Sequence, residues 1–231
     1  MDIQVSQGKE VDLGDLKEFG ARFPGRFPES GMQMQYESQL RLEGGQTGPS
    51  VTTRHGIRGF IFFGPSKDRV VQVRRDGFGF SKLHPYESWE KLREEARELW
   101  AHYVECCRPT SVQRLAVRYI NKLPLPEGQV ELPEWVKVHP EIPDEFGPME
   151  EFLVRFAMRH PVAKDHRAVT MLAAQPANEG LSVVFDIDVF SEVDLEPEAN
   201  RVWTTLDDLR EFKNDVFFGT ITKAMEERLL R

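Results

Sequence analysis

The hydrophobic periodicity of the chain changes twice from a period of two to a period of 3.6. A short helix is predicted from Asp12 to Phe23, before Pro24 and Gly25. The run 32–43, "MQMQYESQLRLE", alternates apolar and polar residues, which is typical of a half-buried strand, and "EGGQTGPS" at 43–50 predicts a flexible connector after it. From Tyr86 to Tyr103 apolar residues recur every three or four positions, which predicts an amphipathic helix after the strands. Further strand-like runs at 151–160, 167–175 and 181–190 precede a second helical region that begins near Asn200 and is expected to continue through Leu229 with a kink at Gly219. Strands followed by a long helix, twice, predict an α+β fold with an antiparallel sheet.

The two helical regions resemble each other in sequence. "WEKLREEAREL" in the first matches the pattern of "WTTLDDLREFK" in the second. We therefore expect two long helices packed on one face of the antiparallel sheet, in a duplicated strand-strand-strand-helix unit. One domain over 1–231 is predicted, and the segment 124–148, rich in proline and acid, is the candidate internal boundary.

Composition limits the classes of function. The net charge of -8 argues against a protein that coats nucleic acid through its overall field. No apolar run approaches the roughly 20 residues of a membrane span, and the first residues lack a basic region followed by an apolar one. Cys106 and Cys107 are adjacent, which suits a reducing compartment and not a metal or redox pair. We expect a cytoplasmic protein without cofactor.

The stretch "RDGFGFSK", residues 75–82, contains the glycines, serine and lysine of phosphate-binding loops. A phosphate loop needs the lysine before the hydroxyl residue and at the start of a helix, and here a strand continues. Asp76-Gly77 between two β-rich runs predicts a two-residue type I′ turn instead. This turn sets Arg75 opposite Phe78 and places Val71, Val73, Phe78 and Phe80 together on one buried face.

Arginines concentrate on the predicted strands, whereas most acids lie on helices and loops. Arg114 and Arg118 share a strand face, as do Arg155 and Arg159. Aligned strands would give an arginine-lined surface able to bind phosphate or carboxylate, with Tyr119 nearby. Alternatively, the arginines pair with strand acids in a solvated ladder.

Asp186 and Asp188 in "VVFDIDVF" are the weak candidates for a metal site. Carboxylates at i and i+2 on a strand project to one face and can hold Mg²⁺ in enzymes that act on nucleotides or phosphates. Such a site needs a third carboxylate, and no clear candidate is present. Histidine spacing gives no zinc motif, and no serine elbow is found, so we predict no catalytic residues and no metal ligands.

Several segments together resemble a known family. "FGFSKLHPYESWEKL", "RLAVRYINKLPLP" and "LREFKNDVFFGTIT" are similar to an uncharacterised, sporadically distributed family of bacterial and archaeal proteins. The family brings no established activity and no catalytic residues. Its patchy occurrence implies an accessory role in a mobile or defence-related locus.

Three hypotheses of function follow from these observations. The first is a non-catalytic binding or interaction module that engages another protein, or a small anionic ligand, through the sheet face or its rim. The second is nucleic-acid binding through Arg114, Arg118, Arg155, Arg159 and Tyr119. The third is a metal-dependent nucleotide or phosphate enzyme that uses Asp186 and Asp188.

Overall fold

The structure is a computed structural model that describes residues 1–41, 50–83, 85–126, 131–143, 145, 147, 149–177 and 180–230. Most of the predicted connector at 43–50, and His84, lie outside these residues. The fold class is α+β with antiparallel strand pairing, which confirms the prediction from periodicity.

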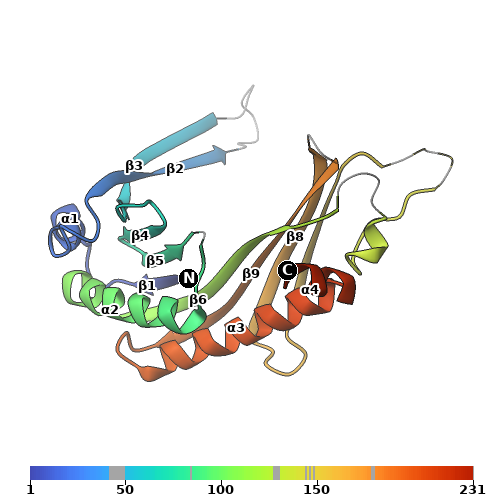
Figure 1. Cartoon of the computed structure of the whole chain (residues 1–231). Helices are drawn as coiled ribbons and strands as arrows, with labels where there is room; N and C mark the ends of the chain where they lie inside the picture. The colour runs from blue at the N-terminus through green and yellow to red at the C-terminus, as the bar shows by residue number, and fades with distance from the viewer. Residues whose placement is uncertain are drawn as a thin grey trace. The chain divides into compact units, whose positions relative to one another are not determined.

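Nine strands and four α-helices are present in the described ranges (Figure 1). The strands are β1 (Asp2–Ser6), β2 (Glu29–Arg41), β3 (Ser50–Phe63), β4 (Arg69–Arg74), β5 (Gly77–Lys82), β6 (Ser111–Leu123), β7 (Phe152–Arg159), β8 (His166–Ala177) and β9 (Gly180–Leu195). The helices are α1 (Leu13–Ala21), α2 (Trp89–Cys107), α3 (Asn200–Thr220) and α4 (Lys223–Leu229), together with the short 3-10 helix η1 (Leu132–Glu134).

The chain divides into two compact units. The first comprises Met1–Gln113 with Asp194–Ala199, and the second comprises Arg114–Val193 with Asn200–Arg231. The boundary at Gln113 falls inside β6, and the segment 124–148 lies within the second unit.

The first unit has the strand order β2-β3-β4-β5-β1, with α1 and α2 as its helices. Val71, Val73, Phe78 and Phe80 are fully buried, as their predicted common face requires. The ring of Phe78 lies 5.8 Å from both Trp100 and Tyr103 of α2. This aromatic contact anchors α2 on the buried face, and it accounts for the apolar stripe of that helix.

The turn between β4 and β5 differs from the prediction. Arg74 pairs with Gly77 and Val73 with Phe78, so the two turn residues are Arg75 and Asp76. Gly77 is already in the strand, and its φ is not positive, so the predicted type I′ turn at Asp76-Gly77 is wrong. Phe78 lies opposite Val73 and not opposite Arg75 as predicted, so the pairing is shifted by two residues. A shift by an even number of residues leaves each side chain on the same face of the sheet, and the four apolar side chains therefore still lie together.

Gly77 has a different physical role from the one predicted. A Cβ at this position would lie 2.4 Å from the carbonyl oxygen of Ile3 on β1, and 2.8 Å from the guanidinium of Arg74. Glycine therefore permits the close approach of β1 to β5.

The second unit has the strand order β6-β9-β8-β7, and α3 lies along the sheet (Figure 1). The ring of Phe217 on α3 stacks on Phe185 of β9 at 6.1 Å. The predicted final helix is interrupted after Thr220, and Thr222 caps α4 by accepting a hydrogen bond from the Met225 backbone N–H at 3.3 Å. Two separate helices thus replace the single kinked helix expected at Gly219.

Both units share one chain topology. In the first, β1 and α1 precede a meander, β2 to β5, that returns to pair with β1 and then leads into α2. In the second, β6 and the η1 segment precede a meander, β7 to β9, that returns beside β6 and leads into α3. The two units have the same order of elements, except that the meander of the first unit has one more strand than the meander of the second. This correspondence agrees with an internal duplication.

Candidate functional site

The sheet of the second unit has one face toward α3 and one face away from it. Val183, Phe185, Ile187 and Val189 of β9 are buried, and Phe185 contacts α3. Side chains alternate along a strand, so the residues between them project from the other side. We call this other side the arginine face; it carries Arg114, Arg118, Ile120, Leu153, Arg155, Arg159, Arg167, Met171, Asp186, Asp188 and Phe190.

Strand register brings the predicted arginines onto this single face. Arg155 pairs with Met171, and Met171 pairs with Asp186. Paired residues share a face, so the β7 arginines lie on the same side as the carboxylates of β9. Asp186 in turn accepts hydrogen bonds from Arg118 of β6. The predicted alignment of Arg114, Arg118, Arg155 and Arg159 is therefore present within this unit.

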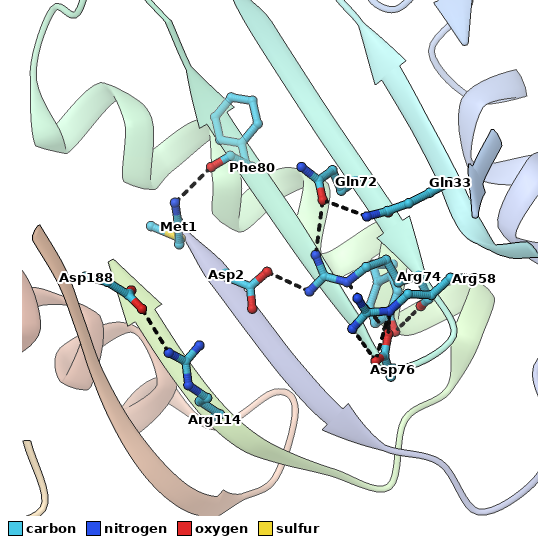
Figure 2. A network of polar contacts seen from close by, with 11 residues as sticks. Met1, Asp2, Gln33, Arg58, Gln72, Arg74, Asp76, Phe80, Arg114 and Asp188 are labelled. Atoms are coloured by element: carbon cyan, nitrogen blue, oxygen red, sulfur yellow. Dashed lines mark hydrogen bonds and ion pairs between the residues drawn. The ribbon is translucent and has the colours of Figure 1, made fainter. Parts of the chain in front are cut away.

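The two arginines of β6 are paired with carboxylates. Arg118 donates from Nε and Nη2 to the two carboxylate oxygens of Asp186, at 2.9 and 2.5 Å. Arg114 donates to Asp188 at 3.3 Å, a pair drawn in Figure 2, and its guanidinium lies 4.3 Å from the ring centroid of Phe190. These contacts form the ladder that was the alternative to a ligand site.

The electrostatic environments of the two aspartates differ. Burial raises the pKa of Asp188 in spite of the opposing effect of Arg114. The hydrogen bonds to Asp186 raise the pKa of Arg118, because they stabilise its charged form. No group of three or more histidine, cysteine, aspartate or glutamate side chains suited to a metal occurs in the described ranges. A metal at Asp186 and Asp188 would have to displace both arginines.

The two arginines of β7 have a different setting. Arg155 and Arg159 are exposed, and neither forms an ion pair with a carboxylate of the described residues. Arg167 beside them on β8 reaches Glu192 only at 3.8 Å. Positive charge that no described carboxylate compensates therefore gathers at the β7 side of the arginine face.

Tyr119, predicted as a ligand-binding neighbour of these arginines, lies on the opposite side of the sheet. The ammonium of Lys213 on α3 is 4.1 Å from its ring centroid. Burial lowers the pKa of Lys213 to about 8. Tyr119 thus belongs to the packing between β6 and α3 and is not part of the arginine face.

Large apolar side chains are exposed on both sides of the sheet near the arginines: Leu153 and Ile120 lie on the arginine face, and Phe156 and Met158 lie on the opposite side of β7. Leu153 and Ile120 are each 65% exposed, and Phe156 and Met158 of β7 are 40% and 37% exposed. Sequence reasoning missed this feature, although a signal was present: "FLVRFAMR" is apolar at both odd and even positions and yet carries two arginines. A strand that is apolar on both faces and remains exposed is a candidate for an interaction surface.

A polar network around the buried Arg74 lies in the first unit (Figure 2). The guanidinium of Arg74 is 5% exposed and donates to Asp2 at 2.6 Å and to Gln72 at 3.3 Å. Gly77 and Gly79 leave room for it, because a Cβ on either would lie within 3.4 Å of a guanidinium nitrogen. Asp2 compensates the charge, so this network stabilises the strand packing.

A surface cavity of about 600 Å³ lies beside the start of α2 in the same unit. Its cations and acids neutralise one another: Arg26 contacts Glu95 at 2.9 Å and Glu98 at 2.8 Å, and Arg69 contacts Glu95 at 3.1 Å. This charge balance gives no preference for an anion or a cation.

The adjacent thiols at the end of α2 show no sign of activation. Cys107 is buried, and burial raises its pKa to about 12; burial also raises the pKa of Cys106. Both side chains are therefore in the thiol form at neutral pH and are weak nucleophiles.

Comparison of the chain with models of protein families, with curated proteins and with solved structures gave no match. None of the helices in the described ranges is long and apolar enough to cross a membrane. The arginine face, with β7 as its most exposed strand, is the feature on which a function can be argued.

Proposed function

We propose that the protein is a non-catalytic binding module that engages another protein through the arginine face of its second unit. The observation that carries this proposal is the combination on β7 of two exposed arginines without described carboxylate partners and of exposed apolar side chains. Arginine together with large apolar residues is the composition enriched at protein interfaces, whereas lysine and glutamate are depleted there.

A protein partner is favoured over nucleic acid by the charges of the face. Arg114 and Arg118 are compensated by Asp188 and Asp186, which would repel phosphates. The whole chain carries a net charge of -8. Two arginines without described carboxylate partners give few phosphate contacts, and exposed Leu153 and Ile120 form no polar contact with a phosphate backbone.

Site-specific photocrosslinking tests the proposal. A photoreactive phenylalanine analogue is placed at Leu153 on the arginine face, and in a matched protein at Phe218 of α3, which is 50% exposed. We expect cells of the source organism to yield a discrete protein adduct from the Leu153 protein and none from the Phe218 protein. Equal labelling of both positions, or no adduct from Leu153, would contradict the proposal.

Nucleic acid is the other outcome to be measured. Fluorescence anisotropy with single- and double-stranded oligonucleotides at low salt, compared with the R155E/R159E protein, distinguishes the two partners. Binding that falls steeply with salt and is lost in the variant would replace a protein partner by nucleic acid.

The resemblance to a sporadically distributed family supports an accessory role in a mobile or defence-related bacterial locus. Identification of the crosslinked partner tests this part separately. A partner encoded beside this chain would support it, whereas a partner from general metabolism would count against it.

A further inference from the structure

β7 is the last strand in the order of the second unit, and only β8 pairs with it among the described strands. The backbone N–H of His160, directly after β7, donates to the carbonyl of His166 at 2.9 Å. Backbone groups alternate in direction along an antiparallel strand. The N–H and C=O groups of Leu153, Arg155, Ala157 and Arg159 therefore point away from β8, toward a position that none of the described strands occupies.

Proteins commonly protect such an edge with proline, lysine, a bulge or a very short strand. β7 has eight residues, no proline and no lysine, and pairs with β8 in continuous register. Leu153 on one side of it, and Phe156 and Met158 on the other, are exposed. These properties suit an edge that receives an additional strand.

The two arginines of β7 determine which kind of strand can pair with it. Suppose that β7 of a second copy paired with this β7 in antiparallel direction, with the two Ala157 residues opposite each other. Arg155 of each copy would then lie opposite Arg159 of the other copy. Like charges directly opposite each other destabilise a strand pair. A strand that carries carboxylates opposite both arginines would instead form two cross-strand ion pairs. Charge thus disfavours a β7–β7 pairing in this register and favours an acidic segment.

We propose that β7 binds an extended segment of a partner protein as an added strand with the pattern acidic, apolar, small, apolar, acidic. This inference rests on the proposed function and names the chemistry of its partner. The two acidic residues lie opposite Arg155 and Arg159, and the central small residue lies opposite Ala157. The two apolar residues extend the exposed surface of Phe156 and Met158. The neighbouring pairs β7–β8 and β8–β9 are antiparallel, and we assign the same direction to the added strand.

A fluorescent peptide with Glu-Val-Thr-Val-Glu at its centre tests the proposal with the whole chain. We expect saturable binding by fluorescence anisotropy, weakened at least tenfold by R155E/R159E and unchanged by R201E, which alters an exposed arginine of α3. A peptide with lysine at both acidic positions should bind the R155E/R159E protein better than the wild type. Melting temperatures confirm that the variants are folded.

N-methylation separates strand addition from simple charge attraction. In an antiparallel added strand the residue opposite Ala157 directs its N–H to β7, whereas the flanking apolar residues direct theirs away. We therefore expect a methyl group on the central amide to abolish binding and a methyl group on an adjacent amide to leave it within about threefold. Equal effects at both positions would overturn the strand model.

The remaining outcomes separate this inference from the proposed function. A partner adduct at Leu153 without binding of any acidic strand peptide would refute the inference and leave the protein-binding proposal in place. A concentration-dependent dimer in analytical ultracentrifugation that F156D/M158D dissociates would make a second copy the occupant and also refute the inference.

Discussion

Gly77→Ala is the change whose effect the structure defines most sharply. The new Cβ would lie 2.4 Å from the Ile3 carbonyl oxygen and 3.2 Å from the Cα of Gln4. Both are backbone atoms of β1, so no rotation of a side chain can relieve the contact. It would also lie 2.8 Å from Nη2 of Arg74, whose guanidinium is held by Asp2. Either β1 moves away from β5, or the buried ion pair is disturbed.

The expected cost is about 2–3 kcal/mol of unfolding free energy. Overpacking of a tight site costs about 1–3 kcal/mol, and the loss of a hydrogen bond to a buried charged group adds to it. Alanine recovers about 0.5–1 kcal/mol because it restricts the unfolded chain more than glycine does. For a chain of this size about 1 kcal/mol corresponds to about 2–4 °C, so the melting temperature should fall by about 4–12 °C.

Differential scanning calorimetry provides the measurement, and Gly219→Ala provides the matched control. Apart from its chain neighbours and the backbone of its own helix, no described atom lies within 4 Å of a Cβ built at Gly219 of α3. Alanine there should stabilise the helix by about 0.5–1 kcal/mol. A Gly77→Ala protein that melts within about 1 °C of the wild type would refute the assigned close approach of β1 to β5.

Two further predictions concern ionisable groups of the second unit. Asp186→Asn should lower the free energy of unfolding by about 1 kcal/mol, and by more than Asp188→Asn does. Asp186 loses its two hydrogen bonds to Arg118, whereas burial already disfavours the charged form of Asp188. Urea denaturation at pH 7 measures both variants, and a larger cost for Asp188→Asn would contradict this account. The pKa of Lys213 is about 8 in the folded protein and 10.5 in the unfolded chain. Between these pH values the unfolded chain binds more protons than the folded protein does. The free energy of unfolding should therefore rise with pH across this window. Lys213→Met should therefore stabilise the protein by about 1–2 kcal/mol at pH 7 and by less near pH 10, and a gain that is equal at both pH values would be inconsistent with the buried charge.

Much of the local structure was predictable, because periodicity and capping act over short distances. The sequence placed the first long helix from Tyr86, but α2 begins at Trp89, since the hydroxyl of Ser88 accepts the Lys91 backbone N–H at 3.3 Å. The first helix was predicted from Asp12, and Asp12 indeed caps α1. β1 was missed, because five residues give too little alternation to distinguish a strand from an extended terminus.

The candidate site was predictable in part, for a related reason. Alternation alone showed that Arg114 and Arg118 share a face, and likewise Arg155 and Arg159. Alternation does not show which strands are neighbours. β6 lies beside β9, which supplies its arginines with carboxylates, whereas β7 is at the edge beside β8. Strand order depends on contacts across many residues, and no local pattern encodes it.

The segment Asp194–Ala199 has a consequence for the way the chain is made. It belongs to the first unit although nearly the whole second sheet precedes it, and it is held there by Trp100, whose indole N–H donates to the Pro197 carbonyl at 3.0 Å. Gln113 likewise donates to Asp194 at 3.2 Å. A ribosome must therefore synthesise β7, β8 and β9 before the first unit has all its parts. No single cut in the backbone can separate the two units, and expression of the first alone would require residues 194–199 to be joined back to it by a linker.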